Sequence, residues 1–266
     1  MSQSSDTPAS LATPESWSES WQNAAAEIRF DPERLPFGEV HDLIRRHLAP
    51  DPGRTVIEIG TFPGRYLWYF AKFFGYRPYG IEYIDWCCER AAEELRKEGV
   101  EATLYNADLF TFEPPAEPGQ WDVVFSAGFV EHFEDPSGAI ARHWDLLRPG
   151  GTLVLVIPNH TGMFGRIMRL ANRNVYKLHN RMSCSDLAAC VKALPGAEIL
   201  EEGYYGRFSL AHVGLFQRTK PLGPLVHYSV RAPVRALEIL LRFIPNCRVL
   251  STNAAVVARK KGTSSE

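Results

Sequence analysis

The chain has 266 residues, which suits one large domain or one domain with an added cap. Its hydrophobic content of 45%, charged content of 23% and formal net charge of −2 are those of an ordinary globular protein. Five cysteines at these spacings indicate neither a disulfide framework nor a Cys-x-x-Cys zinc site, no apolar run reaches the roughly 18 residues of a membrane span, and a cytoplasmic location is therefore predicted.

The N-terminal part is predicted to precede the main domain. Residues 1–19 are rich in Ser, Thr and Pro and are predicted to form a flexible leader. Amphipathic patterns predict helices over Trp17–Phe30 and Phe37–Leu48, so residues 20–50 are assigned to N-terminal helices. The main domain then covers residues 51–266.

Strands and helices are predicted to alternate from residue 55 onwards. This alternation is typical of a parallel sheet that helices cover on both faces. The predicted strands are Thr55–Ile59, Arg77–Ile81, Val100–Tyr105, Trp121–Phe125, Thr152–Ile157, Glu198–Gly203 and Asn253–Arg259, and the helices are Gly64–Phe74, Trp86–Glu98, Pro136–Leu147 and Ser183–Leu194.

Two segments, residues 160–182 and 206–250, interrupt the alternation and are predicted to form a substrate cap. Residues 160–250 carry 13 Lys and Arg against 5 Asp and Glu, so positive charge is concentrated in this part of the chain. Arg166, Arg169 and Arg173 belong to it. A solvated helix face and a surface for an anionic acceptor both explain this charge.

The first strand ends in an acidic residue and a turn that contains glycine, Glu58-Ile59-Gly60-Thr61-Phe62-Pro63-Gly64. Glycine allows a tight turn and a close approach of a ligand to the backbone. Glu82 follows the second strand, 22 positions after Gly60, where a carboxylate can accept hydrogen bonds from ribose hydroxyls. A nucleotide-like ligand is predicted at this edge of the sheet.

With Asp108, the run Ser126-Ala127-Gly128 and the turn Pro149-Gly150-Gly151, this pattern resembles the class I S-adenosylmethionine-dependent methyltransferases. The resemblance implies a three-layer α/β/α sandwich with a mostly parallel seven-stranded sheet whose last strand is antiparallel. It also implies S-adenosylmethionine as the cofactor. A looser likeness is to methyltransferases of bacterial glycan and secondary-metabolite pathways.

The resemblance assigns the cofactor to the loops that follow the strands. Glu58 has an alternative role in capping the loop backbone, and Asp108 in forming a turn. Phe62 stands where the family usually has a glycine, and it either narrows the pocket or packs under the helix. The implied cofactor-binding residues are Glu58, Gly60, Thr61, Phe62, Gly64, Glu82, Tyr83, Asp108, Leu109, Ser126, Ala127 and Gly128.

His132 and His160 are the candidate catalytic residues, because each follows a strand at the expected mouth of the pocket. A structural role of His132 at the edge of the cofactor is the alternative. No metal ion is predicted.

The predicted reaction is methyl transfer to a small-molecule acceptor, most readily at oxygen, by in-line displacement. The alternatives are nitrogen or carbon methylation of a secondary metabolite or sugar, and a protein that binds the cofactor without catalysis. The acceptor is expected to be anionic or sugar-linked, and nucleic acid is not expected as a partner.

Residues Leu222–Ile244 mix apolar and basic side chains, which fits a cap or homodimer helix better than a membrane-surface helix.

Overall fold

The structure is a computed structural model, and it describes residues 8–22, 27–32, 38–116, 120–208, 221, 223–241 and 243–262. Seven strands form one sheet in the order β3-β2-β1-β4-β5-β7-β6. All pairs from β3 to β5 are parallel, and β7 runs antiparallel to both of its neighbours. The predicted mostly parallel sheet with an antiparallel last strand is thus confirmed. The strands are β1 (Thr55–Ile59), β2 (Arg77–Glu82), β3 (Thr103–Asn106), β4 (Trp121–Ala127), β5 (Leu147–Pro158), β6 (Ala197–Tyr205) and β7 (Asn253–Lys260).

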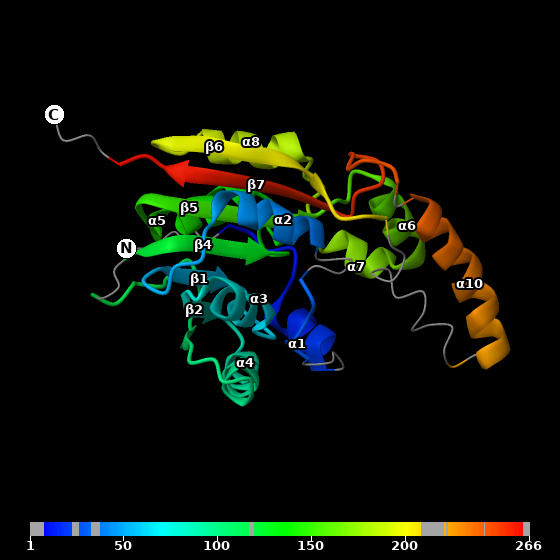
Figure 1. Cartoon of the computed structure of the whole chain (residues 1–266), viewed down its shortest axis with the longest axis horizontal. Coiled ribbons are helices and arrows are strands. Elements are labelled where there is room, and N and C mark those ends of the chain that lie inside the picture. The colour runs from blue at the N-terminus through cyan, green and yellow to red at the C-terminus, as the bar shows by residue number, and fades with distance from the viewer. Residues whose placement is uncertain are drawn as a thin grey trace, which may run out of the picture.

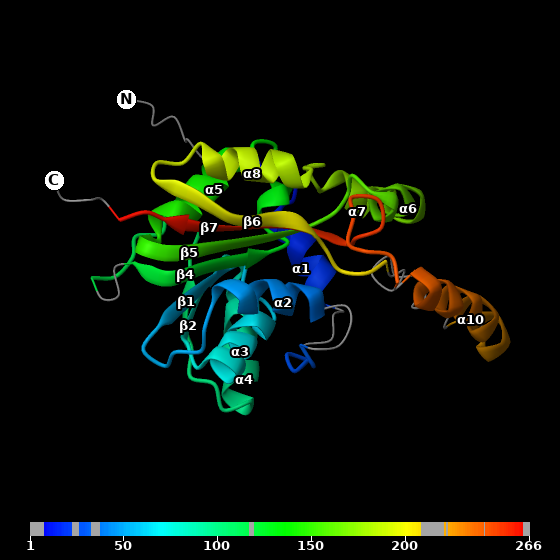
Figure 2. The same cartoon turned by 45° about the horizontal axis from the view of Figure 1, so that its top comes forward.

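Helices cover both faces of this sheet, as the alternation predicts (Figures 1 and 2). On one face lie α2 (Gly38–His47), α3 (Arg65–Tyr69), its π-helical continuation η1 (Phe70–Phe74) and α4 (Asp85–Lys97); on the other lie α5 (Pro136–Asp145) and α8 (Cys184–Lys192). Neighbouring residues of a strand point to opposite faces. Val56 and Val123 therefore pack with α2 and α3, whereas Ile57 and Val124 pack with α5 and α8.

The N-terminal part differs from its prediction. Helix α1 (Pro14–Gln22) begins before Trp17 and ends well before Phe30, and residues 27–30 are not helical. The chain is also ordered against the domain from residue 8, because Ser10 forms a β-bridge with Phe133. The leader predicted over residues 1–19 is therefore wrong from residue 8 onwards, and residues 1–7 lie outside the described residues. The polar composition of this segment predicts flexibility, but backbone pairing with the distant residue Phe133 holds it against the domain.

The two extra segments are largely helical. The first contains α6 (Met163–Ala171) and α7 (Arg173–Lys177), and the second contains α10 (Pro224–Leu241), which projects from one end of the molecule in both views (Figures 1 and 2). Residues 209–220, 222 and 242 of the second segment lie outside the described residues. In the described part of the chain, no helix has the length and apolarity that crossing a membrane requires.

An ion-pair cluster fastens α2 to the edge strand β6. The Glu201 carboxylate accepts hydrogen bonds from Arg46 at 2.6 Å, from His47 Nε2 at 2.7 Å and from the Tyr205 hydroxyl at 2.7 Å. These partners lower the pKa of Glu201 to about 2, with the Arg46 guanidinium as the main cause. The stabilisation is present above the pKa of an unfolded glutamate and is lost as the pH falls through about 2.

We expect Glu201→Gln to lower the free energy of unfolding by roughly 1 kcal/mol at pH 7, a modest value because solvent screens this partly exposed cluster. The difference from wild type should vanish as the pH approaches 2. Urea denaturation at several pH values measures it. A difference that does not depend on pH would show that the charge of Glu201 is not the source.

Candidate functional site

A cavity of about 650 Å³ opens at the carboxyl ends of the parallel strands. This is the edge where ligands bind in open α/β sheets, because the loops after neighbouring strands separate there. Its walls come from the loops after β1, β2, β3, β4 and β5 and from the N-terminal segment. Among the predicted site residues, the lining includes Glu58, Gly60, Thr61, Phe62, Glu82, Tyr83, Asp108, Leu109, Ala127, Gly128 and His132.

Glu82 ties together two of the loops that form this cavity. Its Oε2 accepts a hydrogen bond from the Phe62 backbone N–H and its Oε1 accepts one from the Ile84 N–H, both at 3.1 Å. The side chain is 7% exposed, and burial raises its pKa in spite of these two bonds. Each carboxylate oxygen can accept a second hydrogen bond, so Glu82 has capacity left for a ligand in the cavity.

Glu58 is buried beside the same turn. Burial raises its pKa well above the usual value, and the nearby Glu82 adds to this effect. Within the described residues, its Oε2 has no hydrogen-bond partner. A buried carboxylate oxygen without a partner is costly, and it marks a place where a donor or a positive charge would be stabilised.

The loop after β3 shows the turn predicted as the alternative for Asp108. Asp108 Oδ1 accepts a hydrogen bond from the Phe110 N–H at 2.9 Å, which shapes the loop. The residue nevertheless lines the cavity with Leu109, which is buried. Tyr83 lies across this end and is 55% exposed. The turn and the cavity wall are thus compatible roles of one residue.

Gly64 and Ser126 were predicted in the site but do not line the cavity. Gly64 sits at the start of α3 with φ 98°, and a Cβ there would lie 3.1 Å from Leu95 of α4, so the packing of α3 against α4 favours glycine at this position. Ser126 is 1% exposed within β4. It precedes the end of its strand, so Ala127 and Gly128 reach the cavity instead.

The N-terminal segment covers the cavity, where the prediction placed segments 160–182 and 206–250. Among the described lining residues none comes from those two segments. Backbone hydrogen bonds from Leu11 N–H to the His132 carbonyl and from Glu134 N–H to the Ala9 carbonyl hold the N-terminal segment in place. It contributes Pro8, Ser10, Ala12, Pro14, Trp17 and Trp21 to the lining, and we call these six residues the roof.

The sequence reasoning missed the roof, although Phe62 was the available signal. Phe62 is 6% exposed and makes edge-to-face contacts with Trp21 at 5.3 Å and Trp86 at 5.5 Å between ring centroids. It therefore connects α1 with α4 and also lines the cavity. The phenylalanine at a glycine position anchors the roof.

Three histidines form a row beside the roof. Trp17 contacts His132 edge-to-face at 4.5 Å, and the ring of His179 lies 4.4 Å from His132 and 4.5 Å from His160. His132 lines the cavity, whereas His160 is buried and does not. The structure thus brings the two predicted catalytic residues together through His179 but gives only His132 access to the ligand.

Burial keeps this row uncharged at neutral pH. Burial, reinforced by His179, lowers the pKa of both His132 and His160 to about 3, and burial also lowers that of His179. Glu131, next to the row, is 1% exposed, and burial raises its pKa to about 8. His132 Nε2 lies 3.6 Å from Glu131 Oε1, too far for a hydrogen bond.

Known proteins share parts of this sequence and this fold. A family model described as a methyltransferase domain matches residues 31–202. The tRNA U34 carboxymethyltransferase of Syntrophotalea carbinolica is 32% identical over 42% of this chain, and the match spans only 34% of that relative's length. The fold is similar to that of the cyclase SpnF, with a TM-score of 0.58 and 16% identity over 84% of this chain and 81% of the other. It is also similar to that of a SAM-dependent methyltransferase from Aquifex aeolicus, with a TM-score of 0.52 and 16% identity over 66% of this chain and 88% of the other.

The turn at Gly60 gives a prediction about stability. Gly60 has φ 74°, and a Cβ there would lie 3.0 Å from the ring of Phe129. Gly150 has φ 80° with nothing within 4 Å, so Gly150→Ala measures the backbone cost alone, about 1–2 kcal/mol. We expect Gly60→Ala to lower the free energy of unfolding by more than Gly150→Ala does in urea denaturation. Equal losses would show that Phe129 does not restrict the turn.

Proposed function

Because this chain belongs to the methyltransferase domain family and uses S-adenosylmethionine, we propose that it methylates an oxygen atom of a small-molecule acceptor. The observation that carries the proposal is the pairing of a cofactor-sized cavity with a neutral imidazole, His132, at its wall. A carbon or nitrogen acceptor would not require a group that removes a hydroxyl proton.

The cavity fits the cofactor in two respects. Its volume of about 650 Å³ lies in the range of small-molecule and cofactor sites. Glu82 presents spare acceptor capacity, and the buried Glu58 Oε2 has no partner among the described residues. These two acidic groups suit a ligand that carries hydroxyl donors at one end and positive charge at the other.

We assign the ends of the cofactor from this arrangement. Glu82 would accept hydrogen bonds from the ribose hydroxyls, and Asp108 with Leu109 and Tyr83, which line the cavity, would enclose the adenine. Glu58 and the turn from Gly60 to Phe62 surround the amino-acid end. Ala127 and Gly128 line the path between the two ends.

When bound, S-adenosylmethionine supplies a methyl group on a sulfonium sulfur, and transfer forms an oxygen–carbon bond as the carbon–sulfur bond breaks and S-adenosylhomocysteine leaves. His132 Nδ1 donates to the Leu178 carbonyl at 2.7 Å, because a carbonyl can only accept. Its Nε2 is therefore the acceptor that takes the hydroxyl proton. Glu131 Oε1 lies 3.6 Å from this nitrogen, and above its pKa of about 8 the carboxylate would stabilise the imidazolium that results. His160 contacts the ring of His179 and does not line the cavity.

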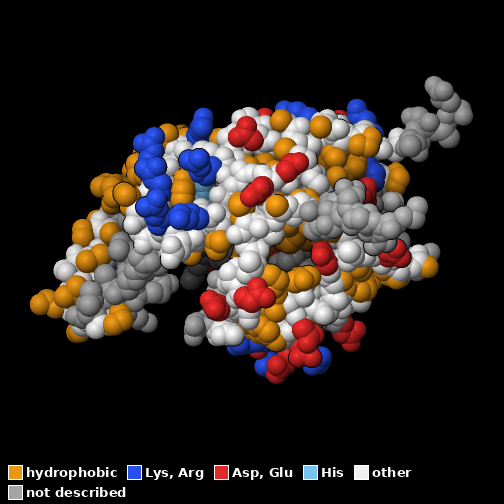
Figure 3. Space-filling view, turned by 180° about the vertical axis from the view of Figure 1, so that it is seen from behind, with side chains coloured by type: hydrophobic (Ala, Val, Ile, Leu, Met, Phe, Trp, Pro, Cys, Tyr) orange, Lys and Arg blue, Asp and Glu red, His pale blue; other side chains and the backbone are white. Residues whose placement is uncertain are grey.

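The residues that line the cavity and the basic residues on and near α6 and α7 indicate the kind of acceptor we propose. Trp17, Phe133 and Phe129 line the cavity, so the part of the acceptor near the methyl group is flat and largely apolar. Among the described residues Arg65 is the cation that lines it. The surface cations gather on α6, on α7 and just beyond (Figure 3), so an anionic or sugar-phosphate portion would lie outside the cavity: Arg166, Arg169, Arg173, Lys177 and Arg181 are all exposed.

Other partners are less well supported. The tRNA-directed relative is matched over a third of its length, so its acceptor is not carried over. We propose a cytoplasmic role in secondary metabolism, which suits five free cysteines. Exposed apolar residues of α10, among them Leu225 and Leu240, favour self-association over contact with a membrane.

Incubation with methyl-labelled cofactor tests the acceptor class. Label should enter hydroxylated small molecules and not bulk tRNA or amines. Label in tRNA alone would contradict the proposed acceptor, and binding of S-adenosylhomocysteine without any transfer would contradict catalysis.

Glu82→Gln should weaken the binding of S-adenosylhomocysteine by about tenfold or more, because one charge-assisted hydrogen bond is worth about 1.5–3 kcal/mol. Since the pKa of Glu82 is raised, wild-type affinity should fall at a higher pH than the usual glutamate value of 4.5. Calorimetric titration measures both. Glu89→Gln, an exposed residue of α4, removes the same charge outside the cavity and should leave the affinity unchanged.

His132→Gln should lower turnover by at least about 100-fold while cofactor affinity stays within a few-fold. Because the pKa of His132 is about 3, wild-type kcat/KM should show no inflection near 6.5 from this group. Steady-state kinetics with the acceptor from the labelling screen measures both. A variant that loses cofactor affinity and keeps turnover would make His132 a structural residue.

A further inference from the structure

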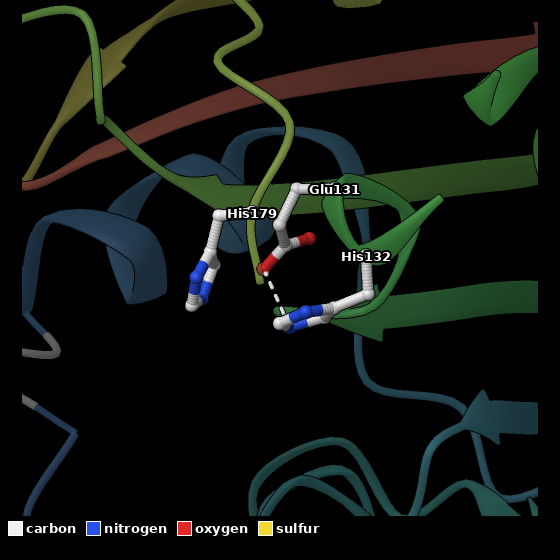
Figure 4. A group of neighbouring side chains, drawn as sticks. All are labelled: Glu131, His132 and His179. Atoms are coloured by element: carbon white, nitrogen blue, oxygen red, sulfur yellow. Dashed lines mark ion pairs between the residues drawn. The ribbon is translucent and has the colours of Figure 1, made fainter. Parts of the chain in front are cut away.

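Three side chains that could ligate a metal ion converge next to the cavity (Figure 4). Glu131 and His132 come from the 3-10 turn η2 (Val130–His132), and His179 follows α7. One potential ligand atom of each lies within 4.8 Å of the other two. Among the described residues no other such group of histidine, cysteine and carboxylate side chains occurs.

Both imidazoles are held in the orientation that metal-bound histidines adopt. His132 Nδ1 donates to the Leu178 carbonyl and His179 Nδ1 donates to the Val175 carbonyl, each at 2.7 Å. A carbonyl fixes the proton on Nδ1, so the lone pair of each ring is on Nε2. Histidine ligands of metal ions generally donate their second ring nitrogen to a carbonyl or carboxylate in this way.

The carboxylate lacks the partners that burial demands. Glu131 is 1% exposed, and within the described part of the chain neither of its oxygens has a hydrogen-bond partner. Its Oε1 lies 3.6 Å from His132 Nε2. That separation is too long for a hydrogen bond. It is close to the distance between two ligand atoms that bind one metal ion at about 2.0–2.2 Å each.

We propose that Glu131, His132 and His179 bind one divalent transition metal ion of the Zn²⁺ type. Two imidazole nitrogens and one carboxylate favour such an ion over Mg²⁺ or Ca²⁺, which prefer oxygen ligands. Three protein ligands leave at least one coordination position open. His132 also lines the cavity, so the ion borders the acceptor.

This proposal departs from the prediction that no metal is bound, and the spacing of the three residues gives the reason that the sequence did not suggest it. Two ligands are adjacent in sequence and the third is 47 positions later, which matches no metal-binding motif. Binding of the ion stands on the geometry alone. Only its use in methyl transfer rests on the proposed function. An ion bound to His132 Nε2 would replace that nitrogen as the activating group: it would lower the pKa of the acceptor hydroxyl at the open coordination position, and the hydroxyl proton would pass to water.

Metal titration of the full-length protein, with any affinity tag removed, tests the site. After treatment with a chelator, Zn²⁺ should bind at one ion per chain by calorimetry and elemental analysis, and Co²⁺ should give the visible absorption of a low-coordinate nitrogen and oxygen site. Glu131→Gln and His179→Gln should each weaken binding by at least about tenfold. His143→Gln removes another fully buried imidazole and should leave metal binding unchanged.

Failure to bind Zn²⁺ or Co²⁺, or equal binding by wild type and Glu131→Gln, would overturn the proposal. Glu131→Gln keeps the shape of the side chain, so it decides the matter even where circular dichroism shows that His179→Gln does not fold. Binding of S-adenosylhomocysteine to the stripped protein is measured in parallel. Neither Glu131 nor His179 lines the cavity. If the stripped protein does not bind S-adenosylhomocysteine, that result would therefore count against the cofactor assignment and not against the metal site.

Discussion

The site depends on three carboxylates that folding removes from water near the carboxyl ends of the parallel strands. Burial raises the pKa of Glu58, Glu82 and Glu131. Only Glu82 has a backbone hydrogen bond to each of its oxygens, and the other two have oxygens without partners among the described residues. The hydrogen bonds within the folded chain do not offset the free-energy cost of that desolvation. A ligand with hydrogen-bond donors or a positive charge would offset it. A ligand in the cavity would therefore be expected to stabilise the fold through Glu58 and Glu82, whereas Glu131 lies outside the cavity lining.

Much of this arrangement could be predicted because it is encoded locally. Each parallel strand is an apolar run, and the loop after it carries the polar residue, so the order of the sequence places Glu82 and Asp108 at one edge. Local patterns do not resolve side-chain direction at a strand end. Nor do they show which backbone groups at a strand end or turn face the cavity: Ser126 and Gly64 were both predicted there, but Ser126 is buried within β4, and a Cβ at Gly64 would meet Leu95.

The roof could not be predicted from local patterns. Its backbone bonds join Leu11 to His132 and Ala9 to Glu134, pairs more than 100 residues apart, and nothing in a Ser- and Pro-rich stretch indicates such partners. The one trace in the sequence was Phe62, whose departure from glycine has a packing reason: it connects Trp21 with Trp86. A deviation from a family pattern thus indicated an additional element, although the sequence did not show which.

Under the function we propose, the roof and the histidine row would together restrict the acceptor. Trp17 lies against the imidazole of His132, so an acceptor that reaches this imidazole must stack beside Trp17 or move it. On its other side, His179 ties the row to α7, because its Nδ1 donates to Val175. The N-terminal segment therefore shapes one side of the acceptor site, and the first of the two extra segments fixes the polar groups on the other. Under the function we propose, acceptor selectivity would therefore depend on the N-terminal segment, which lines the cavity, and on the first extra segment only through His179, while the strand-end loops would hold the cofactor.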